Sequence, residues 1–376
     1  MITANVQDFR EGARRRLPRF LFDYLDGGSY AERTLKTNTA DFEAIALRQR
    51  VLRDVSEIDL SAELFGAKAA MPLALAPVGL AGLFARRGEV QAARAAKEAG
   101  LPFCLSTVSA CPLAEVREAL QAPFWFQLYM IKDRGFMREL LQQAQAAGCT
   151  ALFFTVDLAV PGARYRDVRN GLTGGANLAR AWQILSHPDW LWDVGVRGRP
   201  LSLGNVAPKM PPGAGIGEFW KWVGANFDAS VTWKELDWIR ESWKGPLIIK
   251  GVLDVEDARQ AAALGADGIV VSNHGGRQLD GALSGVRALP PVADAVGDRL
   301  TVLMDGGVRS GLDVVRALAL GAHGVMIGRA WAYALAADGG RGVARMLKIL
   351  AQEMRVAMVL TGHRRISELS RDALAS

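Results

Sequence analysis

The chain carries the sequence Gly268-Ile269-Val270-Val271-Ser272-Asn273-His274-Gly275-Gly276-Arg277-Gln278. Its first four residues form an apolar run with the length of a short buried strand. A histidine and an arginine follow, separated by two glycines that allow a sharp turn and the close approach of a ligand. A histidine base beside a fixed cation suits an anionic substrate that must lose a proton. The alternative is a helix-capping turn with a structural histidine and a solvated arginine.

The same strand-then-turn pattern recurs along most of the chain. Apolar runs with the character of strands occupy residues 71–76, 102–105, 124–129, 151–156, 247–250, 268–271, 300–304 and 324–327. Amphipathic helical stretches lie between them, for example at 90–99, 113–120, 136–147, 255–264 and 312–320. Eight strands alternating with helices predict an α/β fold, a parallel (β/α)8 TIM barrel. A doubly wound open sheet is the alternative, but the glycine fingerprint often found in its first turn is not visible.

Two further parts frame the repeats, and we treat residues 1–376 as one barrel domain. Residues 1–50 are expected to be mostly helical, with Asp26-Gly27-Gly28 ending one helix, and 343–360 are expected to form a long helix that closes the barrel. Within that first segment, the pattern alone favours Tyr24 as a core aromatic.

Polar groups and glycines follow every predicted strand. In a parallel barrel these positions meet at one end, where active sites lie. They are Pro77, Val78 and Gly79, Ser106, Gln127 with Tyr129, Thr155 with Asp157, Lys250, His274 with Arg277, Asp305, Gly306 and Gly307 with Arg309, and Gly328 with Arg329. A barrel with only a structural role would not need such residues at each strand, so the pattern predicts a large polar ligand across the barrel mouth.

The last two strand ends and Lys250 indicate the kind of ligand. Glycine turns, arginines and helix starts after strands seven and eight are typical of a phosphate site. A buried lysine needs an anionic partner or an altered pKa. Lys250 therefore belongs either to a Lys–Asp pair inside the barrel or beside a cofactor ring that becomes negative on reduction, which suggests flavin mononucleotide (FMN).

Composition excludes several classes of protein. The net charge of +6 comes from 45 Lys and Arg against 39 Asp and Glu. This excess fits an anionic substrate, a phosphate cofactor or an anionic membrane surface, and it is too diffuse for nucleic acid. The three cysteines are scattered and suit a reducing compartment, no Cys/His spacing suits a metal, and no run approaches the roughly 20 apolar residues of a membrane span.

A long insertion, about 158–230, interrupts the repeat after the fourth strand. It contains Arg164, Gly174-Gly175, a Pro/Gly-rich stretch at 208–217, and the tryptophans Trp182, Trp190, Trp192, Trp220 and Trp222. Tryptophans beside basic residues suit a membrane interface. An active-site lid or a subunit contact packed through its tryptophans is the alternative.

These residues resemble the FMN-dependent α-hydroxy-acid oxidising enzymes. The resemblance covers nearly the whole chain and includes the opening 268–278 stretch, Phe22-Asp23-Tyr24-Leu25-Asp26-Gly27-Gly28, Trp125-Phe126-Gln127-Leu128-Tyr129, Thr155-Val156-Asp157 and Pro161-Gly162-Ala163-Arg164-Tyr165-Arg166-Asp167. Within that family, Leu47-Arg48-Gln49-Arg50, Ala85-Arg86-Arg87-Gly88-Glu89-Val90-Gln91 and Trp192-Asp193-Val194-Gly195 are similar to the bacterial respiratory L-lactate dehydrogenases.

The resemblance implies a role for each residue. His274 would be the catalytic base, oriented by Asp157, and Tyr129 would bind the substrate hydroxyl. Arg277, Tyr24 and Arg164 would hold the substrate carboxylate. FMN would be held by Pro77, Val78, Gly79, Ser106, Gln127, Thr155, Lys250, Asp305, Gly306, Gly307, Arg309, Gly328 and Arg329.

It also implies partners and a location. The substrate would be L-lactate or a similar 2-hydroxy acid. The electron acceptor would be quinone or another respiratory-chain acceptor. The enzyme would be a homotetramer, held peripherally on the cytoplasmic side of the inner membrane. A soluble oxidase that makes hydrogen peroxide, a dehydrogenase for a bulkier acid such as mandelate, and a non-catalytic FMN-binding barrel are the alternatives.

Overall fold

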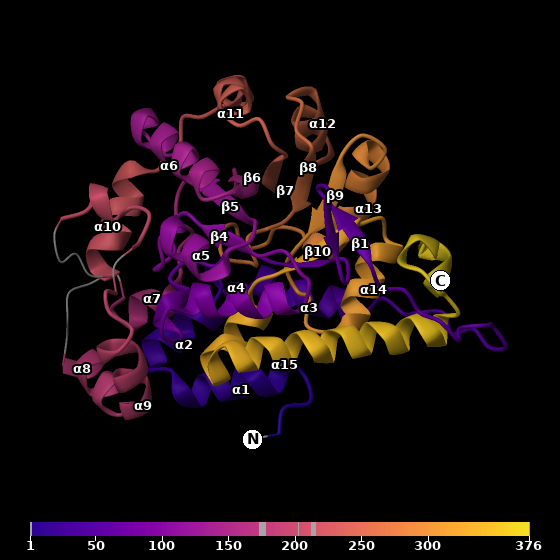
Figure 1. The fold of residues 1–376 in the computed structure, drawn as a ribbon, viewed down its shortest axis with the longest axis horizontal. Helices are drawn as coiled ribbons and strands as arrows, with labels where there is room; N and C mark the ends of the chain where they lie inside the picture. Colours follow the sequence, from indigo (N-terminus) through magenta and orange to yellow (C-terminus); the bar gives the residue numbers. More distant parts are fainter. Residues whose placement is uncertain (1, 173–177, 202, 212–215, 376) are drawn as a thin grey trace.

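The computed structural model describes residues 2–172, 178–201, 203–211 and 216–375 (Figure 1). Eight parallel strands form one sheet in the order β3-β10-β9-β8-β7-β6-β5-β4. A further parallel bridge between Leu75 and Phe103, beside the outermost strands β3 and β4, closes the sheet. The strands are β3 (Leu73–Leu75), β4 (Cys104–Ser106), β5 (Phe124–Tyr129), β6 (Cys149–Thr155), β7 (Leu247–Val252), β8 (Gly268–Val271), β9 (Thr301–Met304) and β10 (Gly324–Ile327). The predicted (β/α)8 barrel is confirmed.

The barrel interior is packed with aromatic side chains at its N-terminal end. Trp125 stacks on Phe153 with 5.0 Å between ring centroids, and Phe65 meets both rings edge-on. Phe65 belongs to the turn of a hairpin, β1 (Ala62–Leu64) and β2 (Ala67–Ala69), in which Phe65 and Gly66 both have positive φ. The sequence analysis did not predict this hairpin, because three-residue strands give too short an alternation to recognise.

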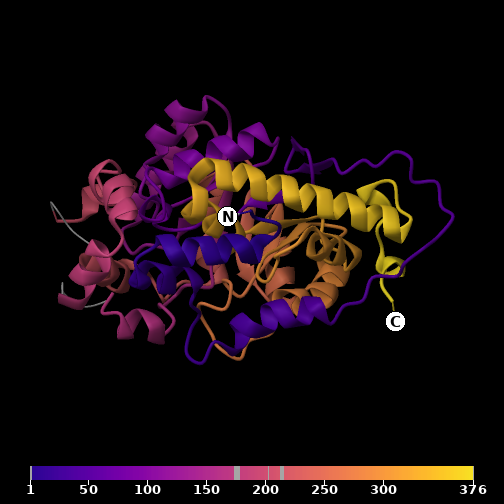
Figure 2. The same ribbon diagram turned by 90° about the horizontal axis from the view of Figure 1, so that it is seen from below.

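Helices surround the strands. They are α4 (Gly88–Glu98), α5 (Leu113–Leu120), α6 (Arg134–Ala146), α12 (Val255–Ala263), α13 (Gly285–Val296), α14 (Gly311–Ala319) and α15 (Arg329–Thr361). Helix α15 begins directly after β10 and is kinked at Asp338 and Gly339. Its long second half, the helix predicted at 343–360, lies beside α1 (Val6–Arg16) (Figures 1 and 2).

The N-terminal segment brings a helix end to the barrel mouth. Helix α2 (Arg19–Asp26) ends where Asp26-Gly27 was predicted to stop it, and α3 (Arg33–Glu43) follows. The last carbonyls of α2 accept hydrogen bonds from two arginines of the barrel, as described below. This helix end is therefore part of the site.

The insertion between β6 and β7 lies beside the barrel mouth, at the left of Figure 1. Its helices are α7 (Tyr165–Arg169), α8 (Leu178–Leu185), α9 (Pro188–Trp190) and α10 (Ile216–Asn226), and α11 (Asp237–Ser242) then runs between α6 and α12 on the outside of the barrel. Gly174-Gly175 and part of 208–217 lie outside the described residues.

The tryptophans of the insertion fall into two groups. Trp190 and Trp222 are buried, whereas Trp182 and Trp192 are 73% and 60% exposed. The side chain of Trp220 lies outside the description. The interior pair fits a packed cover over the mouth, and the exposed pair fits an external apolar surface.

Candidate active site

His274 and Asp157 form a close pair at the barrel mouth. Asp157 follows β6, and its Oδ1 lies 2.7 Å from His274 Nδ1. Burial raises the pKa of Asp157, but the facing histidine, Lys250 and a backbone hydrogen bond together lower it more, so that the pKa stays below its usual value and the carboxylate stays charged. A carboxylate at Nδ1 favours a proton there and leaves Nε2 free as a base.

The turn that carries His274 is unusual in its backbone. His274, Gly275 and Gly276 all have positive φ, at 57°, 66° and 71°. A Cβ on Gly276 would lie 2.6 Å from the backbone nitrogen of Leu35, so glycine is required there. The hydroxyl of Ser272 accepts from the amide of His274 at 3.0 Å and helps to hold this conformation. The predicted sharp glycine turn is confirmed.

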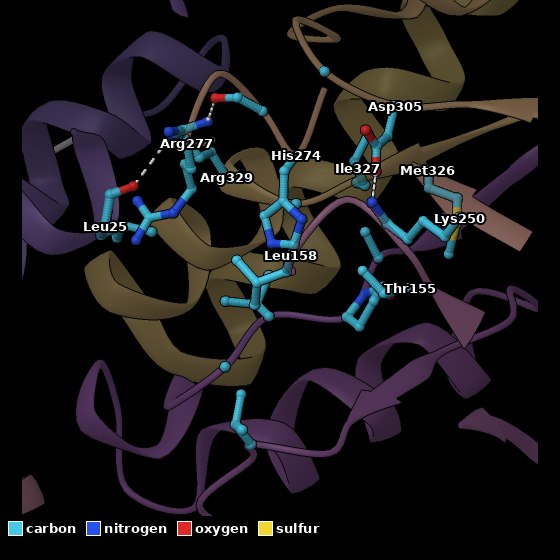
Figure 3. A pocket seen from close by; sticks show the side chains of 18 of the residues that line it. Leu25, Thr155, Leu158, Lys250, His274, Arg277, Asp305, Met326, Ile327 and Arg329 are labelled. Carbon is cyan, nitrogen blue, oxygen red and sulfur yellow. Dashed lines mark hydrogen bonds and ion pairs between the residues drawn. The ribbon is translucent and has the colours of Figure 1, made fainter. Parts of the chain in front are cut away.

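Three arginines and a tyrosine lie beside the histidine. Arg277 Nη1 donates to the carbonyls of Tyr24 and Gly27, and its guanidinium lies 4.8 Å from the ring centre of Tyr24. Arg329 donates to the carbonyls of Leu25 and Gly275 (Figure 3). Tyr24 is buried, as the pattern predicted, and it also lines the cavity. The third arginine, Arg164, comes from the insertion.

These arginines form a cluster of buried positive charge. Burial lowers the pKa of Arg164, and the charge of Arg277 adds to this effect. Burial likewise lowers the pKa of Arg329, with contributions from Arg277 and Arg309. Positive charges held together in this way are stabilised by a bound anion. The cluster can therefore bind a carboxylate or a phosphate.

Lys250 lies on the other side of His274 in Figure 3. Its Nζ is 2.8 Å from Asp305 Oδ2 and 3.0 Å from Ser272 Oγ. The Lys–Asp pair that the sequence analysis kept as an alternative is present. Lys250 also lines the cavity, and the buried Oδ1 of Asp305 has no hydrogen-bond partner among the described residues. This oxygen is available to accept from a ligand hydroxyl.

Tyr129 lies at the end of β5 and lines the same cavity. Its ring packs against Phe227 in a tilted arrangement with 4.9 Å between centroids and stacks on the ring of His274 at 6.5 Å. Burial raises the pKa of the Tyr129 hydroxyl well above its usual value, and the nearby Asp157 raises it further. The hydroxyl is therefore a neutral hydrogen-bond donor and acceptor.

One cavity of about 1140 Å³, including its opening to solvent, joins most of the predicted site. It is lined by Tyr24, Pro77, Val78, Gly79, Tyr129, Thr155, Arg164, Lys250, His274, Arg277, Asp305, Gly306, Gly307, Arg309, Gly328 and Arg329. Ser106, Gln127 and Asp157 lie behind this lining. Ser106 Oγ donates to Gln127 Oε1 at 3.0 Å, and the buried Nε2 of Gln127 has no partner within the described part of the chain.

The cavity fits FMN. Gln127 Nε2 and Asp305 Oδ1 offer an unused donor and an unused acceptor, as a polar ring and a hydroxylated chain require. Arg309 and Arg329 supply cations for a phosphate. A Cβ on Gly328 would meet only Val78 within 4 Å, so this glycine leaves open space on the cavity wall.

The sequence analysis missed the apolar side of the cavity. Val223 and Phe227 reach it from α10 and the residue after it, and Leu158 reaches it from the start of the insertion. Apolar residues in a segment without a repeat carry no sequence signal for this position. The contact of Phe227 with Tyr129 becomes visible only in the folded chain.

The barrel, the His–Asp pair and the cation-lined cavity suit an enzyme that acts on an anionic substrate with a phosphorylated cofactor. The model of the FMN-dependent dehydrogenase family matches residues 13–376. The chain therefore belongs to the FMN-dependent dehydrogenases, and its cofactor is FMN.

Relatives support this assignment over the full length. The chain is 64% identical over 376 residues to an L-lactate dehydrogenase of Caulobacter sp. (strain K31), covering 100% of this chain and 99% of that one. It is 60% identical to an L-lactate dehydrogenase of Stenotrophomonas maltophilia (strain K279a), with full coverage of both. Among solved structures, the monotopic membrane protein (S)-mandelate dehydrogenase aligns with a TM-score of 0.94 and 37% identity, covering both chains completely.

Proposed function

We propose that this enzyme oxidises L-lactate to pyruvate and passes the electrons to a quinone of the respiratory chain. The observation that carries the proposal is the His274–Asp157 pair, 2.7 Å apart, at the edge of a cavity lined by cations. A small 2-hydroxy acid offers both groups that this site can bind, a carboxylate and a hydroxyl. The full-length identity of 64% to an L-lactate dehydrogenase supports lactate as that acid.

Some residues around the substrate bind it, and others transfer its proton. Arg277 binds the carboxylate with its guanidinium fork, and Tyr24 and Arg164 assist. Tyr129 hydrogen-bonds the substrate hydroxyl. His274 Nε2 takes one of the two protons that lactate loses, and Asp157 stabilises the imidazolium that results. FMN, when bound, supplies the acceptor for two electrons and the other proton.

The residues on the cofactor side hold and polarise the flavin. Lys250 would stabilise negative charge on the ring. Pro77, Val78, Gly79, Ser106, Gln127 and Thr155 would surround the ring. Asp305, Gly306, Gly307, Arg309, Gly328 and Arg329 bind the ribityl chain and phosphate, because glycine turns and arginines converge there.

The insertion supports a membrane location for electron transfer. Helix α8 and the π-helical segment Leu191–Val196 expose Trp182, Leu185 and Trp192. Arg197 and Arg199 are exposed in the same segment. Aromatic and aliphatic side chains beside arginines suit the interface of an anionic membrane. None of the described helices is long and apolar enough to span a bilayer.

We infer that the enzyme binds peripherally to the cytoplasmic side of the inner membrane. The structural neighbour described as a monotopic membrane protein supports this inference. The homotetramer implied by the family resemblance stays a prediction.

The second candidate function is oxidation of a bulkier 2-hydroxy acid such as mandelate. It is supported by the solved structure of (S)-mandelate dehydrogenase, which aligns with this chain at a TM-score of 0.94. Anaerobic mixing of the purified enzyme with L-lactate, D-lactate, glycolate and L-mandelate, followed by flavin absorbance, separates the substrates. We expect fast bleaching by L-lactate. Bleaching by mandelate alone would change the substrate and keep the chemistry.

Admitting air to the reduced enzyme then tests the acceptor. Slow reoxidation in air with fast reoxidation by a quinone is the expected result. Fast reoxidation in air with formation of hydrogen peroxide would identify an oxidase. If no acid bleached bound FMN, the proposed function would be wrong.

A further inference from the structure

A second cavity lies against the active-site cavity, on the far side of a thin wall. Thr155 and Leu158 line both cavities. The second cavity has a volume of about 870 Å³, including its opening. Its other walls come from the ends of β6 and β7 and from residues 228–236, which connect the insertion to α11.

The two cavities have opposite electrostatic character. Lys250, Arg164, Arg277, Arg309 and Arg329 line the first cavity. The described lining of the second cavity contains no lysine, arginine or histidine, and its charged members are two aspartates, Asp228 and Asp257. Asp228 is paired with Arg134. Lactate and pyruvate are anions, so the first cavity attracts them, whereas the described lining of the second offers them no cation.

The remaining lining of the second cavity suits a flat, neutral molecule. Met130, Val156, Val231 and Leu236 supply apolar surface, and Trp233 supplies an aromatic face. None of the described residues accepts a hydrogen bond from the indole N–H of Trp233, so it is available to a carbonyl oxygen. An apolar pocket with few polar groups is the usual form of a site for a small organic ligand.

We propose that this second cavity binds the head group of the quinone that reoxidises the enzyme. The proposal rests on the proposed function, in which a quinone is the acceptor. The quinone takes two electrons and one proton from the reduced cofactor and a second proton from solvent, into which His274 releases the proton it took from lactate, and it leaves as the quinol. The shared wall of Thr155 and Leu158 separates the two ligands by about one side chain, so the acid and the quinone do not compete for one space.

The first test is photolabelling of the FMN-loaded enzyme with a water-soluble azidoquinone, followed by peptide mapping. We expect label within residues 228–236, and we expect it to persist at saturating pyruvate, which occupies the cationic cavity. Label confined to residues of the first cavity, and removed by pyruvate, would overturn the separate site while leaving quinone as the acceptor.

The second test fills the cavity with Val231→Phe. We expect flavin reduction by L-lactate to change less than twofold, while reoxidation by a short-chain quinone slows at least tenfold and labelling of 228–236 is lost. Val51→Phe, an exposed valine outside this lining, is the matched control. Unchanged reoxidation by quinone in a folded Val231→Phe enzyme would overturn the site. If that variant does not fold, the labelling pattern of the unmodified enzyme decides.

Failure of the site and failure of the proposed function give different results. If the unmodified enzyme, once reduced by lactate, is reoxidised by an artificial dye but by no quinone, the proposed acceptor fails and the site fails with it. If quinone reoxidises it but labels only the first cavity, the site alone fails.

Discussion

The barrel mouth and the insertion beside it are built on different principles. At the mouth, side chains from every strand converge on one cavity, and their charges and hydrogen bonds are held by backbone groups of α2 and the 274–276 turn. The insertion instead combines two interior tryptophans with two exposed ones. The difference suggests a division of labour, in which the mouth performs the chemistry and the insertion determines where the enzyme works.

The largest expected effect comes from removing the proposed base. Asparagine tolerates the positive φ of position 274 better than most residues, so His274→Asn should fold and retain FMN. Its rate of flavin reduction by L-lactate should fall by about 10³-fold, the order expected for loss of a general base. Stopped-flow absorbance measures this rate. His187→Ala, in the insertion, is the control and should keep the normal rate. Equal losses in both variants would show that the chemistry is not confined to the barrel mouth.

Arg277→Lys should have the next largest effect. Lysine keeps the charge but cannot reproduce the planar fork, so kcat/KM for L-lactate should fall by about 10²-fold. Steady-state kinetics with an artificial acceptor gives this ratio. Arg197→Lys, on the exposed part of the insertion, should leave it unchanged. A normal kcat/KM in Arg277→Lys would contradict a two-point contact with the carboxylate.

Asp26 lies where the two regions meet, and it tests their coupling through stability. It is buried and paired with Arg10 of α1 and Arg166 of α7, and it accepts from Tyr333 at 2.7 Å. Burial alone would raise the pKa of Asp26, but these three partners lower it to about 2. A carboxylate with a lowered pKa stabilises the fold above its unfolded pKa of 3.8, and this contribution is lost as the pH falls from 3.8 toward 2.

Asp26→Asn should therefore lower the free energy of unfolding by about 2 kcal/mol at pH 7. The difference from the unmodified enzyme should shrink as the pH approaches 3. Urea unfolding at several pH values measures both. Asp298→Asn, an exposed aspartate, should change stability by less than about 0.5 kcal/mol. A difference that does not depend on pH would show that charge is not the cause.

The smallest effect is expected outside the site. Trp182→Ser combined with Leu185→Ser removes exposed apolar surface from α8, so binding to anionic phospholipid vesicles should weaken about tenfold. Flavin reduction by lactate should not change. Vesicle sedimentation measures the binding, with Val51→Ser as the control. If the double variant bound normally, the exposed tryptophans would need another role, such as a subunit contact.

The fold and the polar part of the site could be predicted because both follow a repeat. Each strand is an apolar run, and its C-terminal end fixes where the next polar residue lies, so His274, Lys250 and Asp305 could be placed at one mouth from spacing alone. The positions of Phe227, Leu158 and Phe65 could not be predicted, because they depend on packing between segments far apart in sequence. Tyr24 was predicted in part. Its helical spacing indicates burial, but not the guanidinium of Arg277 over its ring.

The hydrogen bonds at the end of α2 also determine how late in synthesis the active site can form. The carbonyls of Tyr24, Leu25 and Gly27 leave the ribosome early, yet their partners, Arg277 and Arg329, lie about 250 to 305 residues later. At roughly 5–20 residues per second, this helix end waits on the order of 15–60 s for its partners. A chain that stops before Arg329 can form many strands but not a complete active site, so only a nearly finished polypeptide can become an enzyme.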